Sequence, residues 1–458
     1  MLKASTIFLG PVLAVIVGGV LWSNGLSGEM VSTASITILV AVWWITEPIP
    51  IPATSLIPLA LFPLFGVLTT KQVAAAYGNW LILLMLGGFM LSAGLEKSGA
   101  HRRIALWMVN IFGGSSGRRL VFGFMAASAI LSMWISNAAT CLMLLPIAMA
   151  VVRQSECEKF KVALLLGIAY AASVGGIGTP IGTPPNLVFM DNYEKITGGS
   201  EISFVQWMFW VLPIVGVMLP VVGFWLTRKL SGVETLTLPQ VGKWRREEVL
   251  ALIVFALTAF CWITRSQPWG GWKTWLNLPE AKDSSVALLG AVSLFLVPNG
   301  KGGKLLDWKT AKNIPWSILV LFAGGICIAE AFKSSGLSTE LATAVAGFGA
   351  LPVLILMGGV CLVVTFLTEV TSNTATTTLL MPILAAAAVG AEMNPLIIMV
   401  PATISASFAF MLPVATPPNA IVFGSEKLTI REMAREGLIL NLLGVVVVTA
   451  ICYWLFGR

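Results

Sequence analysis

Four polar interruptions of long apolar segments hold the residues best suited to bind a small solute. In the first half of the chain, residues 132–140 read Ser-Met-Trp-Ile-Ser-Asn-Ala-Ala-Thr, and residues 175–186 end in Thr-Pro-Pro-Asn. In the second half, residues 368–376 read Thr-Glu-Val-Thr-Ser-Asn-Thr-Ala-Thr, and residues 416–419 repeat Thr-Pro-Pro-Asn. Their hydroxyl and amide oxygens, together with carbonyls freed from helical bonding, are hard neutral ligands that suit Na⁺.

The paired prolines predict where new helices begin. Proline lacks a backbone donor and clashes with the preceding helical turn. Thr183 and Thr416 therefore suit the N-cap, with Pro184 and Pro417 at the first helical position. Helix N-termini attract anions, so we expect one site that binds an anion and a cation side by side. The alternative is that these small polar residues only pack or kink helices.

The two halves of the chain repeat one another. Residues 81–105 resemble residues 317–342, and an offset of 236 relates Ser136 to Ser372 and Asn137 to Asn373. An offset of 233 relates the first Thr-Pro-Pro-Asn to the second. Matches that keep their order along the chain indicate a duplicated unit.

The elements that carry these residues are predicted to be membrane-spanning helices. Hydrophobic residues make up 57% of the 458 residues and charged residues only 11%, with a mean hydropathy of +0.90, far from a soluble protein. We expect eleven spans, near residues 5–22, 31–47, 50–66, 80–112, 160–190, 203–228, 247–265, 284–297, 315–348, 394–424 and 433–456. Segments 119–153 and 352–391 carry a polar break at mid-length, which predicts two re-entrant helical hairpins.

Charge predicts the orientation. Most of the 28 Lys and Arg residues fall on the side that holds the N-terminus, and by the positive-inside rule that side is the cytoplasm. The sequence thus predicts a multi-pass protein of the plasma membrane (the inner membrane of a bacterium) with the C-terminus outside. A first helix within residues 1–30 precedes two copies, 31–235 and 236–458. Each copy makes an odd number of crossings, so the second is inverted, as in alternating-access transporters.

Other classes of protein fit less well. The chain has one His, six scattered Cys without a CxxC pair, and no HExxH or GxSxG motif, which argues against an enzyme or a zinc site. Its net charge of +7 follows from topology and does not indicate a nucleic-acid partner. A channel is a further alternative, although hairpins and inverted repeats favour an occluded site.

The paired Ser-Asn motifs, each followed by a Thr-Pro-Pro-Asn turn, resemble those of the divalent anion:sodium symporter family, the INDY-type dicarboxylate transporters. The resemblance spans essentially the whole chain. It implies Na⁺-coupled symport of small divalent anions, C4-dicarboxylates such as succinate, malate and fumarate, with Na⁺ as the coupling ion. It also implies a homodimer in the bilayer that works as an elevator, in which a scaffold domain, including the first helix, stays fixed while a transport domain moves.

The resemblance also assigns residues. It implies a first sodium site at Ser132, Ser136, Asn137 and Gly182, and a second at Thr368, Thr371, Asn373 and Ala415. It implies carboxylate contacts at Asn137, Thr183, Asn373, Thr374, Thr416 and Pro417, with Ala138 at the position where the family offers a hydroxyl. That departure keeps alternatives open: a sulfate or tricarboxylate transporter, or a sodium-independent anion exchanger. Glu369 either tunes the second sodium site or pairs with a nearby donor.

Overall fold

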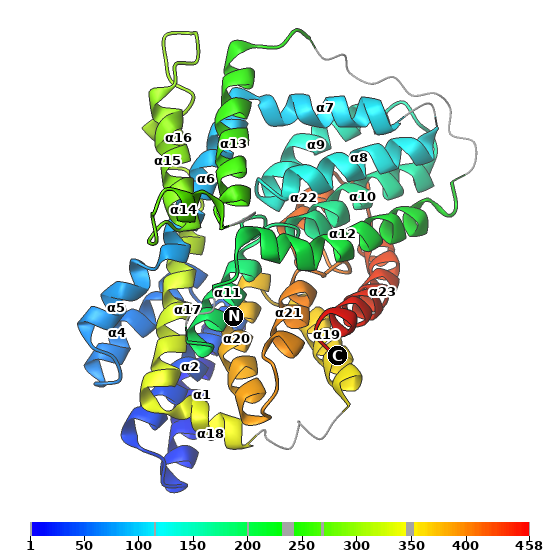
Figure 1. The fold of residues 1–458 in the computed structure, drawn as a ribbon. Coiled ribbons are helices and arrows are strands. Elements are labelled where there is room, and N and C mark those ends of the chain that lie inside the picture. The colour runs from blue at the N-terminus through cyan, green and yellow to red at the C-terminus, as the bar shows by residue number, and fades with distance from the viewer. Residues whose placement is uncertain are drawn as a thin grey trace.

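A computed structural model describes residues 2–113, 116–198, 201–230, 242–266, 270–344 and 352–457 of the chain (Figure 1). In these ranges the chain is helical, and its one β-type pairing is an isolated bridge between Pro298 and Lys304. The predicted boundary between the two copies, at residues 235 and 236, lies outside the described residues. Within the described ranges, nine helices are long and apolar enough to cross a membrane. The prediction of an all-α polytopic membrane protein is confirmed in this coarser form.

The helices of the N-terminal half are α1 (Leu2–Ser23), α2 (Gly28–Thr46), α3 (Ile51–Thr54), α4 (Leu56–Leu64), α5 (Thr70–Tyr77), α6 (Trp80–Ser98), α7 (Ala100–Gly113), α8 (Gly117–Ser132), α9 (Asn137–Val152), α10 (Glu158–Gly176), α11 (Pro184–Ile196) and α12 (Phe204–Thr227). Those of the C-terminal half are α13 (Arg246–Thr264), α14 (Gly271–Trp275), α15 (Asp283–Leu296), α16 (Trp308–Ala311), α17 (Trp316–Ser335), α18 (Leu337–Ala344), α19 (Val353–Thr368), α20 (Asn373–Gly390), α21 (Leu396–Ala406), α22 (Pro417–Phe423) and α23 (Ile430–Phe456).

Two of the expected single spans are each divided into two helices at a glycine. The segment 80–112 breaks at Gly99, which takes a left-handed conformation (φ 78°) and ends α6 before α7 begins. The segment 315–348 breaks in the same way at Gly336 (φ 80°), between α17 and α18. Glycine adopts this conformation without the steric cost that a Cβ imposes, so it commonly ends a helix.

The helices form two groups, each of which packs mainly within itself. We call the first group the frame; it comprises α2–α6, α13 and α15–α17. We call the second the broken-helix group; it comprises α8–α12 and α19–α23, and it contains all four polar breaks. In Figure 1 the frame lies to the left and the broken-helix group to the right. Both groups take helices from both halves of the chain.

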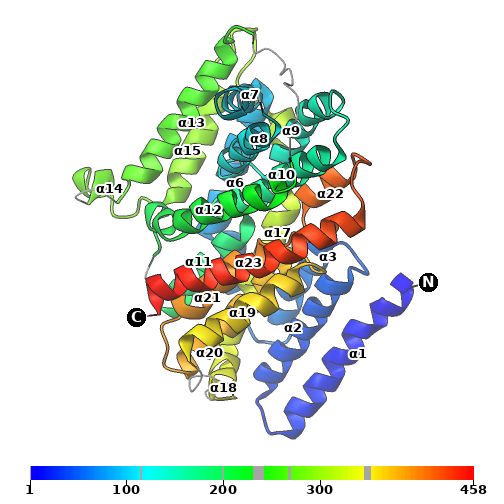
Figure 2. The same cartoon turned by 90° about the vertical axis from the view of Figure 1, so that its right-hand side faces the viewer.

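The remaining helices lie between or beside these groups. Helices α7 and α18 contact members of both groups. Helix α1 packs on α2 at the edge of the molecule (Figure 2). Apolar side chains on its outer face, such as Phe8 and Val15, are exposed. An apolar helix exposed in this way suits lipid or another apolar surface.

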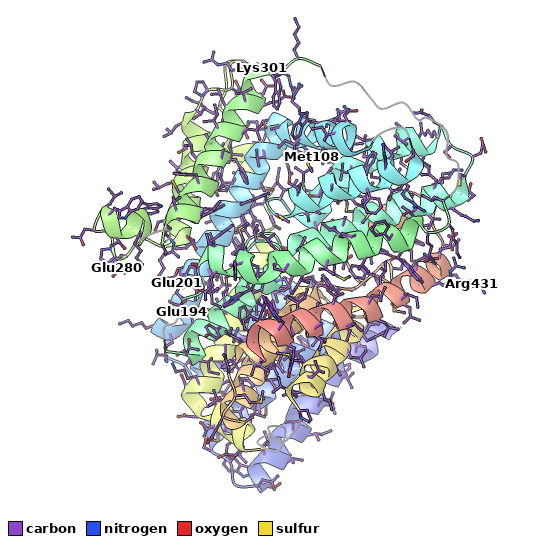
Figure 3. All side chains as sticks on the ribbon, turned by 45° about the vertical axis from the view of Figure 1, so that its right-hand side comes forward. Met108, Glu194, Glu201, Glu280, Lys301 and Arg431 are labelled. Carbon is purple, nitrogen blue, oxygen red and sulfur yellow. The ribbon has the colours of Figure 1, made fainter. Side chains whose placement is uncertain are left out.

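Ion pairs join the two groups along one edge. Arg265, at the end of α13, pairs with Glu201 at 2.9 Å and with Asp283 at 2.6 Å. Lys282 lies 3.4 Å from Glu194, and Figure 3 shows Glu194 and Glu201 close together on this edge. The Arg265 and Asp283 side chains are only 3% and 5% exposed, so this pair is removed from water and removal of either partner is costly.

Candidate binding cavity

A cavity of about 850 Å³ lies between the frame and the broken-helix group. All four breaks reach it, although they are separated by up to 280 residues in the chain. The residues from the predicted site that line it are Ser136, Asn137, Ala138, Gly182, Thr183, Thr371, Asn373, Thr374, Ala415, Thr416 and Pro417. The two predicted residues outside the lining, Ser132 and Thr368, each hydrogen-bond a lining asparagine. The structure therefore brings the whole predicted set together.

Four helices begin at this cavity. Ser136 caps α9 by accepting a hydrogen bond from the backbone N–H of Ala139 (3.2 Å), and Ser372 caps α20 in the same way through Ala375 (3.5 Å). The helices α9, α11 and α20 have 16, 13 and 18 residues, long enough for an appreciable dipole. Their positive ends meet at the cavity, where they favour negative charge, and the described lining holds no cationic side chain.

The double-proline helices begin at the predicted positions. Thr183 and Thr416 are the N-cap residues of α11 and α22, each followed by proline. The Thr416 hydroxyl accepts from the backbone N–H of Asn419 (3.3 Å), whereas the Thr183 hydroxyl makes no capping bond. The two copies thus differ here. Thr183 lines the cavity, and its hydroxyl does not accept a capping hydrogen bond.

A cluster of oxygen atoms lies behind Asn137 at the end of α8. The Ser132 hydroxyl is 2.5 Å from Asn137 Oδ1 and 2.8 Å from the Ala172 carbonyl oxygen. A hydroxyl has one proton and donates it to one acceptor, so three oxygens here share a single hydrogen. A cation bound to this cluster would relieve that excess of acceptors. An asparagine amide turned over would supply a proton instead, and these two arrangements differ in their response to Na⁺.

The unwound backbone approaches this cluster closely at two glycines. A Cβ placed on Gly176 would lie 2.5 Å from Asn137 Oδ1. A Cβ on Gly182 would lie 2.3 Å from the Gly176 carbonyl oxygen and 3.0 Å from that of Ser132. Only glycine at these two positions permits the Asn137 amide to pack against residue 176 and the carbonyl oxygens of residues 176 and 132 to pack against residue 182. The predicted first sodium ligands Ser132, Asn137 and Gly182 are therefore neighbours in space.

The second copy repeats the oxygen cluster. The Thr368 hydroxyl lies 2.6 Å from Asn373 Oδ1 and 3.0 Å from the Ala406 carbonyl oxygen. Thr371 donates to the Leu367 carbonyl (2.8 Å), and its hydroxyl contacts that of Thr376 at 2.6 Å. Neutral oxygens dominate again, and in the described ranges no three His, Cys, Asp or Glu residues group into a metal site. This donor set suits an alkali cation better than a transition metal.

Asn186 and Asn419, to which the sequence analysis assigned no role, hold the unwound segments in shape. The Asn186 amide donates to the carbonyl of Thr179 at 2.8 Å and lies 3.3 Å from that of Ile177. The Asn419 amide donates to the Ala409 and Leu412 carbonyls, both at 3.0 Å. Both side chains are fully buried. Each asparagine occupies the fourth position of a Thr-Pro-Pro-Asn motif, and this repetition in the sequence could have identified both as structural residues of the site.

Glu369 is a structural residue by its contacts. One carboxylate oxygen accepts from the Met411 N–H (2.9 Å) and the Asn441 amide (2.7 Å), and the other accepts from the Leu412 N–H (3.0 Å). These bonds tie α19 to the unwound segment after α21 and to α23. Of the two roles considered for Glu369, pairing with nearby donors is the one that these contacts favour.

Comparison with known proteins places this geometry in context. The sequence model of a family described as "Citrate transporter" matches residues 41–403. The sodium-dependent dicarboxylate transporter SdcS of Staphylococcus saprophyticus is 40% identical over 474 aligned residues, which cover 98% of this chain and 90% of SdcS. SdcS of Staphylococcus aureus is 37% identical with the same coverage.

Two solved structures share the fold. The YdaH transporter of Alcanivorax borkumensis superposes with a TM-score of 0.61 at 12% identity, over 84% of this chain and 87% of that one. MtrF of Neisseria gonorrhoeae, described among antimetabolite efflux pumps, superposes with a TM-score of 0.60 at 14% identity, over 84% and 83%. At these identities the likeness concerns the fold alone.

Proposed function

The chain belongs to the citrate transporter family, and from that premise we infer that it is a membrane transporter coupling the movement of small dicarboxylates to Na⁺. The resemblance to the divalent anion:sodium symporters is confirmed by this membership and by the SdcS relatives. The main structural support for this function in the present chain is the convergence of four helix breaks on one cavity. This convergence places helix starts, which attract anions, beside clusters of neutral oxygens.

We propose that Na⁺ binds at the two oxygen clusters. The first site takes Ser132, Ser136, Asn137 and Gly182, and the second takes Thr368, Thr371, Asn373 and Ala415. The excess of acceptors around the Ser132 and Thr368 hydroxyls supports this assignment. Each cation would sit behind an asparagine, at the oxygen cluster, and the face of that asparagine that lines the cavity would meet the substrate.

The dicarboxylate then lies between the two asparagines. Its carboxylates would be held by the residues at the starts of α9, α11, α20 and α22 that line the cavity, with Ala138 beside them. These residues are Asn137, Thr183, Asn373, Thr374, Thr416 and Pro417. With no cationic side chain in the lining, bound Na⁺ supplies the positive charge. Binding of substrate and of Na⁺ therefore favour each other, which is the basis of coupling.

The transport mechanism we propose is an elevator. Every break belongs to the broken-helix group, while the opposite wall comes from α2, α6 and α17 of the frame. A complete site carried by one group can move past the other without being taken apart. The same proposal includes the topology of eleven spans with two re-entrant hairpins, α8–α9 and α19–α20. It also includes the cytoplasmic N-terminus, the plasma-membrane location and the homodimer.

The cavity is proposed to face the cytoplasm. Its wall includes residues 50–52 after α2 and Pro315, Ser317 and Ile318 at the start of α17. In the sequence, the start of α17 follows the segment that carries Lys301, Lys304 and Lys309. Figure 3 shows Lys301 at one end of the molecule. By the positive-inside rule that end is cytoplasmic.

Uptake in proteoliposomes tests the function. We expect radiolabelled succinate to accumulate in the presence of an inward Na⁺ gradient and to stop accumulating when K⁺ or choline replaces Na⁺. Asn137→Ala and Asn373→Ala should each abolish uptake, because each amide serves both the cation and a carboxylate. Succinate uptake that is equal in choline and in Na⁺ would rule out the coupling.

Citrate is the second candidate substrate. The matching family is described by citrate, and Ala138 removes a hydroxyl that its counterpart Thr374 retains on the other side of the cavity. Competition of unlabelled succinate, citrate and sulfate against labelled succinate distinguishes the candidates.

A further inference from the structure

Glu47 is the one charged residue in the lining of the cavity, among the residues that the structure describes. The rest of the lining is apolar or neutral and polar. A cavity built for a dianion is thus free of Lys and Arg and carries a carboxylate instead. A carboxylate repels anions and attracts cations. Its presence in the lining of a cavity proposed to bind a dianion therefore needs an explanation.

The backbone holds Glu47 at a defined point. Helix α2 ends at Thr46, and Glu47 caps it in a left-handed conformation (φ 46°, ψ 49°), with its N–H donating to the Trp43 carbonyl at 3.0 Å. Few residues other than glycine adopt this conformation. The chain continues as Pro48-Ile49-Pro50-Ile51-Pro52, and the prolines restrict the backbone that follows. The position of Glu47 is therefore fixed by the fold.

The Glu47 side chain is exposed and unneutralised. In the described ranges no Lys, Arg or His forms an ion pair with it, whereas the carboxylates of Glu194, Glu248 and Asp307 each have a basic partner. Glu47 also belongs to the frame, and the predicted site residues belong to the broken-helix group. We call the part of the cavity around the exposed Glu47 side chain the cavity mouth. The charge of Glu47 lies at this mouth and is separate from the proposed binding residues.

We propose that Glu47 sets the charge selectivity of the cavity mouth: it concentrates Na⁺ there and disfavours anions in proportion to their charge, so that trianions are penalised more than dianions. This inference rests on the proposed function and adds a specificity determinant to it. Because Glu47 stays with the frame, it acts on the solute only while the cavity faces this mouth.

The size of the effect follows from Coulomb's law. At a separation of about 10 Å in a water-like medium, neutralising one carboxylate favours a dianion by about fourfold and a trianion by about eightfold. The same change disfavours Na⁺ by about twofold. Neutralising Glu47 should therefore strengthen anion binding, more for a trianion than for a dianion, and weaken Na⁺ binding. This combination of effects identifies an electrostatic role for the residue. Screening weakens all three effects at high salt, because the Debye length falls from about 30 Å at 0.01 M to about 3 Å at 1 M.

Glu47→Gln tests the proposal in membrane vesicles that expose the cavity side of the full-length chain. Labelled succinate uptake at fixed Na⁺ and pH 8 is competed with unlabelled succinate or citrate, and choline chloride sets the ionic strength. At about 0.01 M we expect the half-inhibitory concentration to fall about fourfold for succinate and about eightfold for citrate, and the half-saturating Na⁺ concentration to rise about twofold. In about 1 M choline chloride the variant should match the native chain.

Two further variants keep the test decisive. Glu47→Asp retains the charge and should behave as the native chain, which separates charge from side-chain packing. Glu392→Gln is the matched control, since Glu392 is also an exposed glutamate with a left-handed backbone (φ 53°) but does not line the cavity. An unchanged citrate-to-succinate ratio in Glu47→Gln, a change that persists at high salt, or the same change in Glu47→Asp or Glu392→Gln would overturn the proposal. Absence of Na⁺-dependent succinate uptake in the native chain would instead refute the proposed function.

Discussion

Removal of the Ser132 hydroxyl is the most direct test of the first sodium site. This hydroxyl is fully buried and lies 2.5 Å from Asn137 Oδ1 and 2.8 Å from the Ala172 carbonyl. Ser132→Ala leaves the backbone and the asparagine in place and removes one of the proposed oxygen ligands. We expect the variant to transport succinate but to need higher Na⁺ concentrations to do so.

The magnitude follows from the contacts that are lost. A hydrogen bond or ligand contact to a charged group contributes about 1.5–3 kcal/mol, and each 1.4 kcal/mol corresponds to a factor of ten in binding. The Na⁺ concentration for half-maximal uptake should therefore rise by about tenfold or more in Ser132→Ala. The maximal rate at saturating Na⁺ should change much less, because the substrate contacts remain.

Ser128 provides a matched control on the same helix. The Ser128 hydroxyl is also fully buried and donates to the Ile168 carbonyl at 2.7 Å, one turn away from the Ser132 bond to Ala172. Ser128→Ala thus removes an equivalent bond between α8 and α10 but no proposed Na⁺ ligand. We expect it to lower the melting temperature without altering the half-saturating Na⁺ concentration.

The assay is succinate uptake in proteoliposomes over a Na⁺ series, at constant ionic strength with choline. A thermal-shift series in detergent measures Na⁺ binding apart from transport, because a ligand that binds the folded state raises its melting temperature. If Ser132→Ala and Ser128→Ala respond to Na⁺ alike, the oxygen cluster around Ser132 is not a sodium site, and an asparagine amide turned over accounts for its geometry.

Three further predictions concern other parts of the molecule. Ala138→Thr restores the hydroxyl that Thr374 has in the second copy, and it should strengthen succinate relative to sulfate in the competition assay; an unchanged ratio would remove Ala138 from the specificity determinants. Arg265→Ala leaves the Asp283 carboxylate buried without its partner and should destabilise the chain by about 3–5 kcal/mol, seen as a lower melting temperature that an added Asp283→Asn partly restores. The hydrogen bond from Lys97 (2.6 Å), together with that from the Thr310 N–H, lowers the pKa of Asp307 to about 2; its stabilising effect is present above the ordinary pKa of 3.8 and is lost only as the pH falls toward 2. Asp307→Asn should therefore shift the melting temperature equally at pH 5 and pH 8, and a difference between the two would contradict this pairing.

The sequence alone was enough to locate the breaks and the helices that start from them. Serine at 136 and 372 and proline at 184 and 417 have strong local preferences for helix starts, and the structure begins α9, α11, α20 and α22 there. The duplication then indicated that these starts belong to one site. Local signals and internal symmetry agree at these positions, so tertiary packing had little to override.

Other features depend on contacts between distant residues. Gly99 ends α6 inside the segment 80–112, which was expected to be one span, and hydropathy does not register a glycine cap. The bonds of Glu369 reach Asn441, 72 residues away, and no periodicity predicts such a pairing. The division into a frame and a broken-helix group likewise arises from packing across both halves, which a count of spans does not contain.

In the proposed elevator mechanism, the neutral cavity wall of the broken-helix group would limit the passage of one ion without the other. Among the described residues, the cavity lining contributed by the broken-helix group contains no ionisable side chain, so its empty binding surface presents no charge that the proposed movement would have to desolvate. A lone dianion, or Na⁺ without its anion, would have to enter the low-dielectric barrier unbalanced, and charges there are costly. Under the proposed elevator mechanism, a wall without fixed charge would permit movement of the empty and of the fully loaded group and would oppose movement with only one kind of ion bound, so that solvation would set the stoichiometry.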